Sequence, residues 1–124
     1  MSIKAVVNQI NINLIVIHSQ DMEISKKLYE TIGISFLYEQ HGSGRKHLSA
    51  VLEGVVFEIY PRSDNVDTSA VRLGFRVPSV DKAIEDLEKI GVVVLSSPRD
   101  SQWGWRAVIL DPDGYKLELV KEKF

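Results

Sequence analysis

The 124-residue chain contains no cysteine, which excludes disulfide bonds, thiolate metal sites and a cysteine nucleophile. Long apolar runs are also absent, and the LIVI stretch at residues 14–17 is far too short to cross a bilayer. The opening residues lack the apolar core of a secretory signal peptide. We therefore expect a soluble cytoplasmic protein with no membrane partner.

Acidic and basic residues nearly balance, since the formal net charge is −2, and no run of five or more basic residues occurs. This composition gives no reason to expect a nucleic-acid partner. The GSGRK stretch at 42–46 lacks the spacing of a phosphate-binding loop, and no G-x-S-x-G motif of a serine hydrolase is present. What remains is the composition of one compact domain, 44% hydrophobic and 26% charged, over residues 1–124.

One pattern occurs twice in the chain. Residues 12–33 and 70–91 each contain a predicted strand, a short turn, a helix and a terminal glycine. Later in each half comes a short strand with a central glutamate, Glu58 in VFEIY and Glu118 in KLELV. The predicted fold class is α+β, with two tandem βαβββ modules that form a cleft-bearing curved sheet. The modules are expected at 11–60 and 70–121, with a linker at 61–69.

Local signals place the elements within each half. Asp21 and Ser79 are expected to cap the two helices, because their side-chain oxygens can accept from first-turn amides. Asp-Pro-Asp-Gly at 111–114 is typical of a tight turn, whereas 96–104, which contains Pro98, is expected to be a loop. Further strands are expected at 34–41, 46–52, 55–60, 92–95, 105–110 and 115–120.

Alternation in the strand that opens the second half indicates which side chains face a cleft. Leu73 and Phe75 alternate with Arg72, Gly74 and Arg76, so the apolar set packs on the helices and the charged set points the other way. Carboxylates, arginines, a histidine and an aromatic on one face are typical of a small-molecule site, and a solvated sheet face is the alternative. Extended to the equivalent strands, the predicted lining is Leu14, Val16, His18, Val56, Glu58, Tyr60, Arg72, Arg76, Lys116 and Glu118.

Several of these features together resemble the glyoxalase / bleomycin-resistance / extradiol-dioxygenase (vicinal oxygen chelate) superfamily. The match is strongest in WGWRAVILDPDGYKLELV at 103–120, and is supported by Asp21, Ser25 and Tyr29 in the first helix and by RVPSVDKAIEDLEKIG at 76–91. The resemblance covers about residues 11–121. It implies the fold but not the reaction, because the family includes lyases, isomerases, dioxygenases, thiol transferases and drug-binding proteins.

The resemblance also implies four metal-ligand positions, which fall on Leu14, Glu58, Arg72 and Glu118. Leucine has no donor atom and a guanidinium stays cationic, so no metal and no other cofactor is expected. A divalent metal held through an unusual ligand such as His18 is the alternative. Arg72 is expected either to neutralise the two glutamates from between them or to recognise an anionic ligand.

Two tryptophans and two histidines lie outside the predicted cleft lining. Trp103 and Trp105 flank the cleft-closing loop of the family pattern, so each either covers a ligand or packs beside a glycine. His41 and His47 have no obvious acidic partner nearby in sequence and are expected on the surface.

Three alternative functions are compatible with these features. The first is a metal-free protein of the bleomycin-resistance type that binds an unknown small molecule in the cleft, and the resemblance implies that it forms a homodimer. The second is a divergent lyase or isomerase with Glu58 or Glu118 as catalytic general base, with or without a divalent metal. The third is an interaction module whose cleft is filled by Arg72 and the glutamates. The residues expected to bind the ligand are His18, Tyr60, Arg72, Arg76, Trp103 and Trp105.

Overall fold

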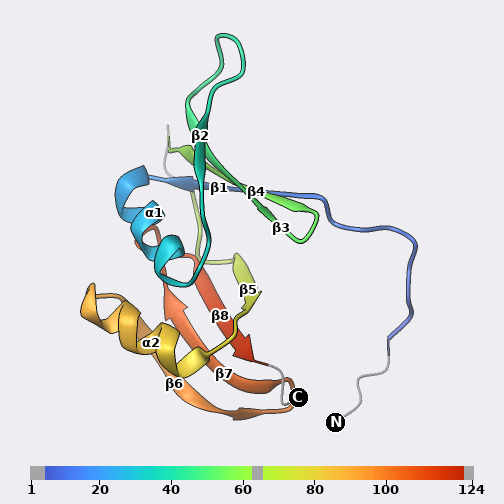
Figure 1. Ribbon diagram of the computed structural model, residues 1–124, viewed down its shortest axis with the longest axis vertical. Helices are drawn as coiled ribbons and strands as arrows, with labels where there is room; N and C mark the ends of the chain where they lie inside the picture. The colour runs from blue at the N-terminus through green and yellow to red at the C-terminus, as the bar shows by residue number, and fades with distance from the viewer. Residues whose placement is uncertain (1–4, 63–65, 122–124) are drawn as a thin grey trace.

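The computed structural model describes residues 5–62 and 66–121, which form two βαβββ units one after the other (Figure 1). This confirms the predicted α+β class. None of the helices in the described ranges is long and apolar enough to span a membrane. The first unit contains β1 (Leu14–Ser19), α1 (Met22–Thr31), β2 (Leu37–Glu39), β3 (His47–Leu52) and β4 (Val55–Pro61). The second contains β5 (Arg72–Arg76), α2 (Val80–Lys89), β6 (Val93–Ser101), β7 (Gly104–Leu110) and β8 (Lys116–Lys121).

Each unit folds its strands into one four-stranded sheet with the same order. The first sheet runs β1-β4-β3-β2 and the second runs β5-β8-β7-β6. The first strand of each unit pairs in parallel with the last, and the other neighbours are antiparallel. The helices of the two units lie next to each other on one side of the molecule (Figure 1).

Both predicted helix caps are present. The carboxylate of Asp21 accepts hydrogen bonds from the backbone nitrogens of Glu23 and Ile24 at 3.1 and 3.2 Å. The hydroxyl of Ser79 accepts from the nitrogen of Lys82 at 3.1 Å. These bonds satisfy amides of the first turn that have no partner within the helix.

The core confirms the predicted alternation of strand faces. Phe57 and Ile59 of β4 are buried, whereas Glu58 and Tyr60 between and after them are half-buried on the opposite face. Aromatic rings connect the two units, because Tyr29 of α1 packs edge-on against Phe57 at 5.3 Å and against Phe75 of the second unit at 6.1 Å between ring centroids.

The predicted loop at 96–104 is wrong, since β6 continues as a strand to Ser101 and includes Pro98. The strand lies at the edge of its sheet, where one row of backbone groups needs no partner. The pairing of β6 with β7 shifts register between Val94 and Ser96 and again between Ser96 and Arg99. The second irregularity contains Pro98, which therefore does not have to pair within the regular ladder. Part of the predicted linker, residues 63–65, lies outside the described residues, and Pro61 belongs to β4.

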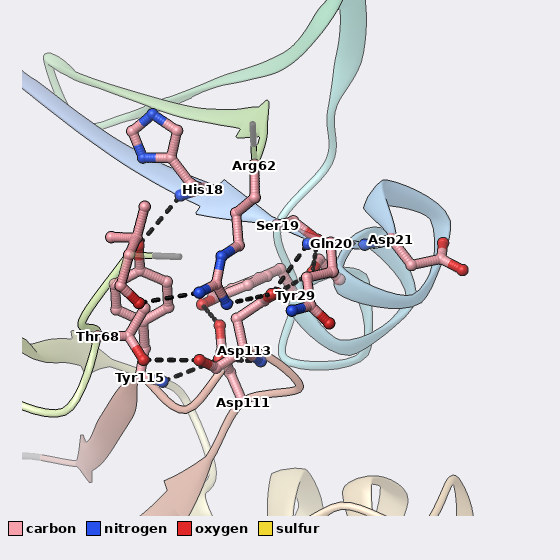
Figure 2. A network of polar contacts seen from close by, with 12 residues as sticks. His18, Ser19, Gln20, Asp21, Tyr29, Arg62, Thr68, Asp111, Asp113 and Tyr115 are labelled. Atoms are coloured by element: carbon pink, nitrogen blue, oxygen red, sulfur yellow. Dashed lines mark hydrogen bonds and ion pairs between the residues drawn. The ribbon is translucent and has the colours of Figure 1, made fainter. Parts of the chain in front are cut away.

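The turn between β7 and β8 joins the second unit to the first (Figure 2). Asp111 accepts a hydrogen bond from the Tyr29 hydroxyl at 2.7 Å and also from the backbone nitrogens of Asp113 and Tyr115. Asp113 accepts from the nitrogen of Gln20 at 2.9 Å. The Asp-Pro-Asp-Gly motif therefore has a structural role, which is to hold the two units in one arrangement.

Candidate functional site

Polar side chains cross the first sheet in a row on the face opposite the helices. Glu39 of β2 is in register with His47 of β3, and His18 of β1 is in register with Tyr60 of β4. The rings of His47 and Tyr60 stack with centroids 4.2 Å apart and planes 11° apart. Desolvation raises the pKa of Tyr60, and the negative charges of Glu58 and Glu39 raise it further, so the phenol stays protonated.

His47 connects this row to Glu58, one of the two glutamates singled out by the repeat. Its Nε2 lies 3.2 Å from Oε2 of Glu58, and its Nδ1 lies 3.0 Å from the carbonyl oxygen of Arg45. The side chain of His47 is only 1% exposed, so its predicted surface position is wrong. His41, by contrast, is 73% exposed, as expected.

Glu118, the equivalent glutamate of the second sheet, has a different partner. The guanidinium of Arg106 on β7 donates to Oε2 of Glu118 from Nε at 3.1 Å and from Nη2 at 2.9 Å. Gly74 on β5 lies opposite Glu118, and a Cβ there would stand 3.3 Å from Cγ of the glutamate. The missing side chain at this position leaves the space that Glu118 occupies.

The predicted position of Arg72 between the two glutamates is wrong. Within the described ranges, Glu58 pairs with His47 and Glu118 with Arg106, and neither pairs with Arg72. Arg106 takes the place foreseen for Arg72, because β7 and β8 form a tight hairpin that brings its planar donor group to the carboxylate.

The four family ligand positions do not fit a divalent metal. Leu14 is 51% exposed and offers no donor atom, and Arg72 presents a cation. Glu118 is already engaged by two guanidinium donors. A divalent ion needs three or four protein ligands, and this set supplies at most two.

A cleft of ≈ 750 Å³ lies between the two units. Its apolar walls include Ile15, Phe57, Leu73 and Phe75, which belong to the helix-facing sides of β1, β4 and β5. The charged groups that line it are Glu53, Arg72 and Arg76.

The structure thus divides the predicted cleft lining among three places. Arg72 and Arg76 line the inter-unit cleft, and the lining residues in the described chain include neither glutamate. The interpretation of a cleft filled by Arg72 and the glutamates is therefore wrong. His18, Glu58 and Tyr60 lie on the open face of the first sheet, and Lys116 and Glu118 on that of the second.

The two tryptophans lie on opposite sides of the second sheet. The indole nitrogen of Trp105 donates to Oδ1 of Asp81, in the first turn of α2, at 2.7 Å. The alternation that aims Arg106 at Glu118 turns Trp105 toward the helix, and the residues of the described chain that line the inter-unit cleft do not include it. Trp103, in the turn before β7, lies near the Arg106–Glu118 pair, with its ring 6.0 Å from the guanidinium carbon.

Comparison with known proteins agrees with this architecture. The model of the Glyoxalase/Bleomycin resistance protein/Dioxygenase superfamily matches residues 11–119. An uncharacterized protein of Mycolicibacterium smegmatis is 26% identical over 107 residues, which cover 86% of this chain and 89% of that one.

Two solved structures have similar folds. TnmS3, an antibiotic-binding protein from Streptomyces sp. CB03234, is 27% identical, with a TM-score of 0.70 over 94% of this chain and 99% of its own. The oxidase ChaP-H2 superposes with a TM-score of 0.74 at 16% identity, over 94% of this chain and 97% of its own, and at that identity the likeness extends to the fold alone.

Proposed function

The chain belongs to the glyoxalase/bleomycin resistance protein/dioxygenase superfamily, and from this we propose that it binds a small organic molecule in the cleft between its two units. The observation that carries the proposal is the cleft itself, which combines apolar and aromatic walls with a few charged groups. Small-molecule sites have this composition, and their volumes are of this order. The likeness to an antibiotic-binding protein over 94% of the chain supports the same function.

The lining defines the class of ligand. Half-buried Phe75 offers aromatic surface, and Arg72, an exposed residue of the lining, carries a guanidinium with planar donors. The ligand we propose is a compact aromatic or apolar molecule with a carboxylate or another acceptor group. It is recognised without a metal at the family ligand positions, because those residues do not fit one.

A thermal-shift screen of the purified chain against aromatic carboxylates and neutral aromatic compounds tests the proposal. A ligand of the proposed class should raise the midpoint of unfolding with a saturable dependence on concentration, because it binds the folded state alone. No saturable shift with any compound of either group would count against cleft binding.

A divergent lyase or isomerase is the second candidate, and the contact between Glu58 and His47 favours Glu58 over Glu118 as its general base. An imidazole can pass a proton to or from a carboxylate 3.2 Å away, whereas the guanidinium bound to Glu118 cannot. In that case Glu58→Gln should abolish turnover of a carbonyl substrate, and Glu118→Gln should preserve it.

We also propose that the protein forms a homodimer. The segment that precedes β1 runs away from both sheets (Figure 1). It carries Val6, Val7, Ile10 and Ile12, which are 71–94% exposed in the single chain. A second copy would cover these side chains, which otherwise expose an unusual amount of apolar surface. A cytoplasmic location stays a prediction from the sequence.

A further inference from the structure

Four side chains from neighbouring strands β2, β3 and β4 of the first sheet bring their ligand atoms close together. They are Glu39 of β2, His41 just after it, His47 of β3 and Glu58 of β4, and one ligand atom of each lies within 4.8 Å of all the others. We propose that these four residues, the His–Glu cluster, bind a divalent transition-metal ion such as Zn²⁺. The site shares only Glu58 with the four family ligand positions. It is independent of the proposed binding of a small molecule in the cleft, whereas it includes Glu58 and His47 of the second candidate function.

The distances are close to those that an ion requires. A tetrahedral ion with bonds of about 2.1 Å holds its ligand atoms about 3.4 Å apart. Nε2 of His47 lies 3.2 Å from Oε2 of Glu58, and Nε2 of His41 lies 3.4 Å from Oε2 of Glu39. All four ligand atoms lie within 4.8 Å of one another, so the two pairs need to approach each other by at most about 1.4 Å. Rotation of the exposed side chain of His41 and of the half-buried side chain of Glu39 can supply that movement.

His47 is a preorganised ligand. Its Nδ1 lies 3.0 Å from the carbonyl oxygen of Arg45, which can only accept, so Nδ1 carries a proton and leaves Nε2 to face the cluster. Stacking on Tyr60 fixes the plane of the ring. A backbone carbonyl that orients the second nitrogen of an imidazole in this way is the usual outer partner of a metal-bound histidine.

The charges of the cluster require a positive species at its centre. With Nδ1 protonated, Nε2 of His47 presents a lone pair to Oε2 of Glu58 at 3.2 Å, and two acceptors do not approach so closely without a proton or a cation between them. The competing explanation is a proton on Nε2 of each of the two histidines, which makes the cluster two ion pairs, His47 with Glu58 and His41 with Glu39.

The donor set selects the class of ion. Two imidazole nitrogens and two carboxylate oxygens suit Zn²⁺, Co²⁺ or Ni²⁺, whereas Ca²⁺ and Mg²⁺ prefer oxygen ligands alone. Mg²⁺ should therefore not compete with Zn²⁺ for the cluster.

Isothermal titration calorimetry of the chelator-treated full chain with ZnCl₂ tests the proposal. We expect saturation at one ion per chain, and an absorption spectrum typical of nitrogen and oxygen ligands when Co²⁺ replaces Zn²⁺. His41→Ala and Glu39→Gln should each weaken Zn²⁺ binding by about tenfold or more. His41 is exposed, and Glu39 is only half-buried at the edge strand of its sheet, so circular dichroism without metal should show the fold of the wild type.

The chain offers two matched controls. His18 is the only histidine outside the cluster and lies on the same sheet face, so His18→Ala should leave the affinity for Zn²⁺ unchanged. Glu118→Gln should also leave it unchanged, because Glu118 would be a ligand only in a site of the family type. Absence of saturable binding would establish the ion-pair explanation. The proposal would be overturned if either control variant lost as much affinity for Zn²⁺ as His41→Ala loses.

Discussion

The phenolic oxygen of Tyr29 lies 2.7 Å from Oδ2 of Asp111 and donates a hydrogen bond to it from one unit to the other (Figure 2). Both residues are buried, and burial raises the pKa of Tyr29 well above its ordinary value, so the donor keeps its proton. This bond ties α1 to the turn between β7 and β8, which also binds the backbone at the start of α1 through Asp113. The bond therefore stabilises the arrangement of the units on which the cleft depends.

Tyr29→Phe should lower the free energy of unfolding by about 1–3 kcal/mol, because it leaves a buried carboxylate without its hydroxyl donor. The phenyl ring keeps the edge-on contacts with Phe57 and Phe75, so the packing contribution stays. Urea denaturation of both proteins measures the difference. Tyr38→Phe is the control, since its hydroxyl binds Glu23 at the surface and should change stability by less than about 0.5 kcal/mol. Equal effects of the two substitutions would contradict the role given to the buried bond.

Asp111 should make stability depend on pH in a specific direction. Burial raises the pKa of its carboxyl above the ordinary value of 3.8, against the lowering effect of its hydrogen bonds. Because the folded-state pKa is the higher one, the stabilising contribution is complete below pH 3.8 and is lost as the pH rises through the folded-state value.

Asp111→Asn removes this titration. The stability advantage of the wild type over the variant should therefore grow as the pH falls from 7 toward 4, as measured by urea denaturation at each pH. An advantage that shrinks over that range would show that the hydrogen bonds outweigh the effect of burial.

Gly114 is the position in the same turn that should tolerate a side chain least. Its φ is +93°, and an added Cβ would stand 2.8 Å from Oγ1 of Thr68, whose hydroxyl donates to the carbonyl of Asp113. Gly114→Ala should therefore destabilise the protein by about 1–3 kcal/mol through backbone strain and loss of that bond.

Gly42→Ala is the matched control for Gly114, because Gly42 also has a positive φ but no atom within 4 Å of the added carbon. Thermal unfolding should show a clearly larger fall in midpoint for Gly114→Ala. If both variants lose the same stability, backbone strain alone accounts for the effect and the contact with Thr68 does not contribute.

The features predicted correctly from the sequence depend on neighbours in the chain. Asp21 and Ser79 cap helices that begin within three residues of them, and alternation along β4 and β5 assigns faces without reference to other strands. The course of β6 was not predictable in this way. Whether a proline can stay in a strand depends on whether that strand lies at an edge, which is a property of the whole sheet.

The partners of the two glutamates need the register between strands, and the turns contain that information. The Glu53-Gly54 turn pairs Leu52 with Val55, so counting back brings His47 beside Tyr60 and diagonal to Glu58. The turn at 111–114 likewise pairs Val108 with Glu118 and brings Arg106 within reach. A search confined to the family ligand positions omits β3 and β7, and both partners lie on those strands.

The homodimer is testable at the segment before β1. A double substitution, Val7→Asp with Ile10→Asp, replaces side chains that are 94% and 87% exposed in the single chain. A monomer should tolerate both changes, whereas a dimer that buries them should dissociate, because unpaired carboxylates are costly to desolvate. Sedimentation equilibrium should give twice the chain mass for the wild type and one chain mass for the variant. A monomeric wild type would exclude the dimer.

Arg72 provides the most direct test of the proposed ligand site. Arg72 lines the inter-unit cleft, and Glu58 and Glu118 pair with other residues, so its guanidinium can donate to an anionic group of a bound molecule. Arg72→Ala should weaken binding of an aromatic carboxylate about tenfold, the loss of one charge-assisted hydrogen bond of about 1.5 kcal/mol. Binding of the matching neutral compound should change little.

Arg99→Ala is the control for Arg72, because Arg99 is an exposed arginine on β6 that does not line the cleft. Its removal alters the net charge by the same amount, so a general electrostatic effect would appear in both variants. Isothermal titration calorimetry with the acid and the neutral compound distinguishes the two cases. Two results would show that the anionic group of the ligand does not bind at Arg72. One is an equal loss of affinity in Arg72→Ala and Arg99→Ala, and the other is an equal loss of affinity for the acid and the neutral compound in Arg72→Ala.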